Sequence, residues 1–449
     1  MLDNPIIRGE FDRITNSAKK LVSWELVATL VVDDVEIYTF PNVSGERFTA
    51  NFMSDMAPYH FLVINAGISV YRDYIYPNIN KLRIRLQRRS QGIENPGEIY
   101  DIKSTDYIAF VTDAQDLHKT TQQRMKQSKD EQDFENFVPI TFQLIEPNLY
   151  LTMNREVSGV HEGTIQDALF TELTVELKEN QNTESLAGEY YTGLRGLVKD
   201  DFDNQRHYDN IIIKTGTRLN TLTNYLQNKY GISSFGIGTF YMFGFWYVYP
   251  LFKHNRFDKK NRTLTIYDIP LQELPTIENS FIKNDNKLFI LSTGKSRNEN
   301  SSVKTEVNDG NGIRIVPIDE YDNGFFEADG NRVKTGASEK AREFIGKEAG
   351  HRVYNVRYHE RKFTANPFPE ISKLKAAQGG LYTVTWMNGD YREIYPGMPG
   401  KIFYERDGEV VSVEGTLVAV NALTTTPTSD IADRSFRQVL ELTFHYREE

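Results

Sequence analysis

The chain has 449 residues, of which 39% are hydrophobic and 25% charged, so it can bury an ordinary core and is not a disordered polymer. Its net charge is −10, from 62 acidic and 52 basic residues. This balance argues against a dedicated nucleic-acid binder, because such proteins bind phosphates mainly through lysine and arginine. The sequence has no cysteine, which excludes disulfides, thiolate chemistry and cysteine metal sites.

Apolar segments that could enter a membrane are short. The first residues have no apolar signal-peptide core. The longest apolar stretch, Phe240 to Phe252, is interrupted by Pro250 and is shorter than the ~20 residues that a membrane helix needs. We therefore expect a protein that is made and folded in a cytoplasm and has no membrane anchor.

Aromatic residues make up 12% of the chain, with 27 Phe, 25 Tyr and 3 Trp. Such residues fit pleated sheets and also anchor protein interfaces, so the composition favours a β-rich fold. Residues 1–150 are accordingly expected to form strands. Trp24–Val32 and Val35–Phe40 flank Asp33-Asp34 and predict a hairpin, and Phe137–Leu151 has strand character.

Lys81–Arg89 alternates between apolar and polar residues, which is typical of a strand with one buried face. The apolar positions are Leu82, Ile84 and Leu86. The opposite, basic face is either solvated or ion-paired with an acidic neighbour. Its members Arg83, Arg85 and Arg89 are candidate protein-interface residues.

Two segments are poor in apolar residues. Asp116–Asn136 predicts a surface arm, a loop, or a helix that packs only against a neighbour. Lys295–Gly312 predicts a linker or loop. A helix is predicted over Thr217–Tyr230, where leucines recur at three- and four-residue spacing, and a shorter one over Ser338–Lys347.

The aromatic run Phe240–Tyr249 predicts a strand with both faces covered, followed by a turn and a strand, Arg262–Ile269, that runs back. Within the run, Trp246 and Tyr247 are candidate protein-interface residues. The C-terminal part predicts a three-strand meander, whose strands are Lys401–Arg406, Val410–Leu423 and Ser435–Tyr446, with a turn at Asp407-Gly408.

No motif for catalysis or cofactor binding stands out. The eight histidines do not have the spacing of a zinc protease, and no nucleophile elbow or Walker loop occurs. The acidic loops Asp200–Asn204 and Asp319–Gly324 lack the ligand pattern of a calcium loop and predict Asx turns. We therefore expect a non-enzymatic protein with no cofactor, no metal and no catalytic residue.

The order of elements over residues 210–249 is an apolar strand, a short helix that ends at Tyr230-Gly231-Ile232, and an aromatic-rich strand. This order resembles the middle of the baseplate hub proteins of contractile-tailed phages. The resemblance implies a structural virion protein, a homotrimer in the tail baseplate, with a mainly β fold and some α (α+β). It also implies two tube-like antiparallel β-barrel or sandwich domains, 1–155 and 365–449, and a mixed middle region, 156–364, that contacts the spike.

The partners implied by this resemblance are the tail tube protein, the central spike protein and the tape measure protein, with baseplate wedge proteins as a further candidate. Three chains with two tube-like domains each would offer six similar positions to a six-fold tube and three to a three-fold spike. One alternative is a peripheral baseplate or wedge protein, present at six or more copies. Another is a carbohydrate-binding β-protein that stacks sugars on Trp246, Tyr247 and Trp386, although apolar neighbours favour burial of Trp246.

Overall fold

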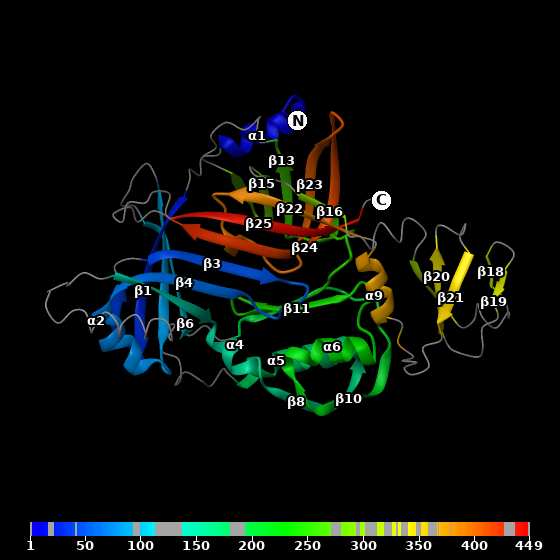
Figure 1. Cartoon of the computed structure of the whole chain (residues 1–449), viewed down its shortest axis with the longest axis horizontal. Coiled ribbons are helices and arrows are strands. Elements are labelled where there is room, and N and C mark those ends of the chain that lie inside the picture. The colour runs from blue at the N-terminus through cyan, green and yellow to red at the C-terminus, as the bar shows by residue number, and fades with distance from the viewer. Residues whose placement is uncertain are drawn as a thin grey trace.

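The computed structural model describes residues 2–16, 22–40, 43–92, 99–112, 137–179, 194–270, 280–292, 297–300, 312–317, 326–328, 331–333, 340–346, 352–357, 366, 368–377, 379–425 and 436–447. The fold is mainly β with some α, as predicted. The predicted arm at 116–136 and the acidic loop at 319–324 lie outside the described residues. Figure 1 shows a large central sheet with two long helices, α5 (Ile165–Glu179) and α6 (Leu219–Lys229), along one side.

The first part of the large sheet consists of seven antiparallel strands in the order β3-β4-β7-β6-β5-β1-β2. Their bounds are β1 (Val22–Val32), β2 (Val35–Phe40), β3 (Val43–Asn51), β4 (Tyr59–Gly67), β5 (Arg83–Gly92), β6 (Ile99–Val111) and β7 (Phe137–Ile145). The predicted hairpin β1–β2 is confirmed, and both turn residues, Asp33 and Asp34, have positive φ, as a type I′ turn requires.

The inner faces of these seven strands share one core, so the sheet curls around its own side chains. The predicted alternation in β5 is confirmed, because Leu82, Ile84 and Leu86 are all buried in this core. Among the described strands, none pairs with the outer edge of β2. Within the part of the chain that the structure describes, the curled sheet therefore does not close into a hydrogen-bonded barrel.

The second part of the same sheet is built around the long strand β24 (Glu409–Thr425). The predicted meander is confirmed, since β24 pairs with β23 (Pro399–Arg406) and with β25 (Arg437–Tyr446). The remaining strands are β13 (Thr263–Asp268), β14 (Phe281–Asn284), β15 (Lys287–Ser292), β16 (Arg297–Asn300) and β22 (Gly380–Met387). Trp386 is fully buried in the core of this part.

One strand pair joins the two parts. β24 pairs with β3 from Asn51 opposite Ala419 to Gly45 opposite Thr425. Strands from the first hundred residues and from the last fifty thereby belong to one hydrogen-bonded sheet of 15 strands.

The middle of the chain forms a separate core beside this sheet (Figure 1). Helices α5 and α6 pack there with two small sheets. These sheets consist of β8 (Glu156–Thr164) with β10 (His207–Arg218), and of β9 (Gly196–Lys199), β11 (Ile237–Met242) and β12 (Phe245–Pro250). The predicted helix at 217–230 is confirmed as α6, whose three leucines at 219, 222 and 226 are buried.

The described residues contain further helices, helical turns and strands. They are α1 (Pro5–Thr15), α2 (Ile68–Val70), η1 (Tyr71–Ile75), η2 (Tyr76–Asn78), α4 (Pro147–Thr152), η4 (Phe257–Lys259), β17 (Gly312–Pro317), β18 (Phe326–Ala328), β19 (Asn331–Val333), β20 (Lys340–Gly346), β21 (Arg352–Arg357), α9 (Phe368–Ala377) and η7 (Tyr391–Glu393). None of the helices in the described part of the chain is long and apolar enough to cross a bilayer.

Several local predictions are wrong. The aromatic run is a hairpin rather than one strand, because Phe243 and Gly244 take positive φ values and turn the chain between β11 and β12. Most residues of the hairpin are buried on both faces, as predicted. The strand after it, β13, does not run back along the hairpin but pairs in parallel with β15 and β23.

In the other errors, the predicted type of secondary structure differs from the type that forms. The helix predicted over Ser338–Lys347 is strand β20, which pairs with β17 and β21, since pairing with distant strands outweighs a short local pattern. The predicted linker at 295–312 contains β16, which pairs with β22. Within the region expected to be all strand, Pro5–Thr15 is helical, and β7 ends at Ile145, before helix α4 begins at Pro147.

Trp246 lies in the core of the middle unit, where it is 2% exposed and meets the Tyr241 ring edge-on at 5.1 Å. Trp246→Ala should therefore lower the free energy of unfolding by roughly 3–5 kcal/mol, through lost burial and the cavity left behind. Urea denaturation measures this loss. Val160→Ala, at a position that is 65% exposed, is the control and should change stability by less than about 0.5 kcal/mol. Equal effects of the two substitutions would contradict a core role for Trp246.

Candidate interaction surfaces and buried charged sites

The basic face of β5 is ion-paired within the chain. Arg83 Nη1 lies 2.7 Å from Asp34 Oδ1, and Arg85 binds the Asp106 carboxylate through Nε and Nη2 at 2.8 and 3.1 Å. Arg85 also pairs with Glu36 of β2. Of the two readings of this face, the ion-paired one therefore holds for Arg83 and Arg85. Arg89 lies in β5, but its side chain is outside the described residues.

A second charged group lies inside the curled sheet. Glu46 of β3, His60 of β4 and Arg88 of β5 are 1%, 3% and 4% exposed. His60 Nε2 is 2.7 Å from Glu46 Oε1, and Arg88 pairs with Glu46 Oε2. In the strand order β3 and β5 are separated by β4, β7 and β6, so this ion pair crosses the interior of the curl.

The second part of the sheet completes this cluster. The Tyr391 hydroxyl, on η7, donates to Glu46 Oε1 at 3.0 Å and accepts from Arg88 Nη2 at 2.8 Å. Thr424 of β24 donates to Glu46 Oε2 at 3.3 Å. Burial alone would raise the pKa of Glu46, but the Arg88 guanidinium and then His60 hold that pKa far below its usual range. Glu46 is therefore a carboxylate whose charge is balanced by groups from both parts of the sheet.

Removing the charge of Glu46 should leave Arg88 buried without its counter-ion. Glu46→Gln is expected to lower the free energy of unfolding by roughly 3–5 kcal/mol, whereas adding Arg88→Met should recover a large part of that loss. Urea denaturation of the single and double variants measures both the loss of stability and the part of it that is recovered. Glu36→Gln, which removes a half-exposed partner of Arg85, is the matched control and should cost less than about 1 kcal/mol. If the Glu46 and Glu36 variants lost the same stability, the buried pair would not have the role described.

Glu146 lies between β7 and α4 and holds the tip of the aromatic hairpin. Its carboxylate accepts the backbone N–H groups of Phe243 at 2.8 Å and Gly244 at 3.0 Å. Burial raises the pKa of Glu146 to about 7, although these two hydrogen bonds favour the charged form. The contact joins the first part of the sheet to the middle unit.

The raised pKa of Glu146 predicts a pH dependence. The folded chain binds a proton that the unfolded chain releases near pH 4.5, so the stabilisation is complete below that pH and is lost as the pH rises through about 7. Between pH 5 and 8 the wild type should lose roughly 2–3 kcal/mol relative to Glu146→Gln, which cannot ionise. Urea denaturation across this range measures the difference. For Glu162→Gln, at an exposed position, the free energy of unfolding should change with pH as it does for the wild type. If Glu146→Gln also showed the pH dependence of the wild type, the raised pKa would not belong to Glu146.

The three aromatic residues considered for sugar binding are buried. Trp246 and Trp386 are 2% and 0% exposed, so neither offers a ring face to a sugar. Tyr247 is 6% exposed and lines a cavity of about 210 Å³ together with Tyr395, whose ring stacks on it at 5.9 Å.

The acidic loop at 200–204 is internally satisfied. Asp200 is buried and pairs with Arg256 and Lys260. Asn204 Oδ1 accepts the backbone N–H of Arg206 at 3.0 Å, which is the predicted Asx turn. Within the described residues, no group of three or more potential metal ligands is assembled here or elsewhere.

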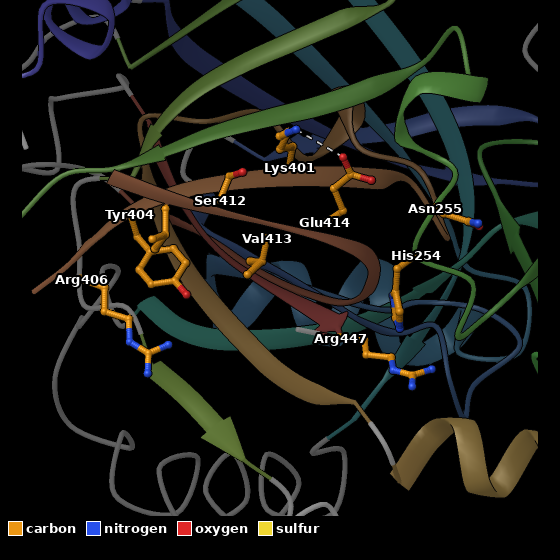
Figure 2. Close-up of a pocket in the computed structure, with 10 residues that line it drawn as sticks. His254, Asn255, Lys401, Tyr404, Arg406, Ser412, Val413, Glu414 and Arg447 are labelled. Carbon is orange, nitrogen blue, oxygen red and sulfur yellow. Dashed lines mark hydrogen bonds and ion pairs between the residues drawn. The ribbon is translucent and has the colours of Figure 1, made fainter. Parts of the chain in front are cut away.

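A larger, open cavity of about 540 Å³ lies beside the β23–β24 hairpin (Figure 2). Three cationic side chains and one carboxylate line it, which gives a net charge of +2; they are Lys401, Arg406, Arg447 and Glu414. Burial, and then the neighbouring His445, lower the pKa of the lining residue His254 to about 3, so this imidazole is neutral at pH 7.

The buried cluster was not foreseen, although its members follow the predicted strand pattern. Arg88 continues the inward row of Ile84 and Leu86 in β5. Glu46 lies two residues before the buried Phe48, and His60 lies two residues before the buried Leu62, so each continues a buried row of its strand. The signal in the sequence was therefore a charged residue at a position where the alternation of the strand predicts a buried, apolar side chain. The open cavity has no comparable signal, because it depends on where distant segments meet.

Comparison with solved structures finds phage proteins. The chain is similar to the 43 kDa tail protein of prophage MuSo2 from Shewanella oneidensis, with 10% identity, a TM-score of 0.44, and coverage of 93% of this chain and 98% of that chain. It is also similar to a chain in the structure of the phage P2 baseplate in its activated conformation with Ca, with 10% identity, a TM-score of 0.30, and coverage of 94% and 98%. No family model matches, and no curated protein matches.

Proposed function

We propose that the chain is a non-enzymatic structural subunit of a contractile phage tail. In this proposal three copies form the baseplate hub, which joins the six-fold tail tube and the tape measure protein to the three-fold central spike. The resemblance of residues 210–249 to the hub proteins is one support. The observation that carries the proposal is the strand pair β3–β24, which joins two strand groups, one antiparallel and one mixed, edge to edge in one chain.

Edge-to-edge pairing is what a ring of similar β modules requires. Each chain supplies two strand groups, one around β4 and one around β24, with separate cores. Three chains would then place six groups around an axis, while the assembly as a whole keeps three-fold symmetry. Neither group closes into a barrel among the described strands, so strand edges remain for contacts between chains.

The middle unit supplies a surface suited to the spike. Val160 of β8 and Ile212 of β10 are register partners, and they are 65% and 47% exposed. Ile211 and Ile213, on either side of Ile212 in the sequence, are buried in the core of the middle unit. Two adjacent exposed β-branched residues on a small outer sheet fit the centre of a protein contact. A trimer would carry a net charge of about three times −10, which would repel DNA phosphates from any central channel.

The stoichiometry tests this proposal directly. Native mass spectrometry of the purified chain should give three times 51.8 kDa, and addition of the spike protein should give a complex with three copies of this chain. A stable monomer that ignores the spike would contradict the hub role. Six or more copies per particle in a reconstruction would favour the peripheral wedge position instead.

The arginines of β5 provide a matched variant for the same experiment. Arg83→Gln removes the positive charge that this position presents outward, and the exposed ion pair with Asp34 that it breaks contributes little to stability. If Arg83 contacts another copy, this substitution should weaken trimer formation with little change in the melting temperature of the fold. An unchanged trimer would restrict Arg83 to its role within the chain.

A further inference from the structure

Strand β24 has an edge that is only partly covered. One edge pairs with β23 over residues 409–416 and with β3 over 419–425. The other edge pairs with β25, and that pairing begins at Gly415, opposite Tyr446. Within the described residues, Glu409–Glu414 therefore has no strand neighbour on its second edge.

The open cavity of Figure 2 lies along this edge. Four successive residues, Val411 to Glu414, line it. Successive side chains of a strand point to opposite faces, so a cavity that contacts all four must border the strand edge rather than one face. Its other wall includes His254 and Arg447, the residue that follows the end of β25.

The charge of the cavity is opposite to that of the chain. The lining has a net charge of +2, whereas the whole chain has −10. Glu414 is matched by Lys401, whose Nζ lies 3.3 Å from its carboxylate. The Arg406 side chain is 63% exposed and lies 3.9 Å from its neighbour Asp407, and Arg447 is exposed. These two guanidinium groups are accessible to carboxylates from outside.

We propose that Glu409–Glu414 is a docking site for an extended, acidic segment of a partner protein, which adds as a strand in the place that β25 leaves after Tyr446. Main-chain hydrogen bonds to β24 would supply affinity, and the carboxylates of the segment would pair with Arg406 and Arg447. The hub proposal leaves open strand edges for contacts between chains, and this inference assigns one of them to a partner segment. Its test measures peptide binding and not trimer formation, so the two can fail or succeed independently.

A designed peptide can test the site. The probe is a fluorescein-labelled ten-residue peptide of alternating valine and glutamate, and its binding is followed by fluorescence anisotropy. The wild type should bind it saturably, and Arg406→Glu with Arg447→Glu should weaken binding by roughly tenfold or more. Arg8→Glu, an exposed charge reversal on α1, should leave binding unchanged.

Two further measurements separate strand addition from simple attraction of anions. A peptide N-methylated at alternate residues keeps its charge but loses backbone donors, and it should not bind. Hydrogen exchange should show new protection at those amides of Val411–Glu414 that point away from β23 when the unmodified peptide is added. Binding that survives N-methylation, or equal competition by inorganic polyphosphate, would overturn the proposal. Protection, in the free chain, of the amides that point away from β23 would also overturn it, because the edge would then be occupied by the chain itself.

Discussion

The carboxylate of Glu46 lies inside the curled sheet, and the groups around it are arranged to keep it charged. A buried carboxylate is costly unless opposite charge and hydrogen bonds compensate it. Here compensation comes from Arg88, on a strand that β4, β7 and β6 separate from β3, so the ion pair holds together faces that no strand pairing joins. The described strands do not close the curl by hydrogen bonding, so this ion pair adds to the apolar core in holding its inner faces together.

The same carboxylate connects parts of the chain that are far apart in sequence. Tyr391 and Thr424, which bind it, belong to the second part of the sheet, and Thr424 lies in the segment of β24 that pairs with β3. The β3–β24 pairing and the charged cluster are thus two contacts at one joint, the boundary between the two parts of the sheet. Apolar residues could stabilise this joint as well, but ionic partners also restrict it to one register.

Much of the sheet could be predicted from sequence, because alternation and turn residues are local signals. The β1–β2 hairpin, the alternation of β5 and the C-terminal meander were all found in this way. Two of the failures share a cause: β16 and β20 are recognisable only through their distant partners. The charged cluster could be predicted in part, since Glu46, His60 and Arg88 occupy inward-facing positions of their alternating strands. Their meeting could not be foreseen without the strand order.

The middle unit is attached at the same place, which makes the cluster the meeting point of all three regions. Phe243, at the tip of the aromatic hairpin, stacks against Phe48 at 6.2 Å and against Tyr391 at 5.9 Å. Tyr391 and Phe48 stack on each other at 4.2 Å and cover the buried charges. Glu146 fixes the hairpin tip through two backbone hydrogen bonds. Phe243 thus contacts residues of both strand groups, and other hairpin residues, among them Phe240 and Tyr249, belong to the core of the second part of the sheet.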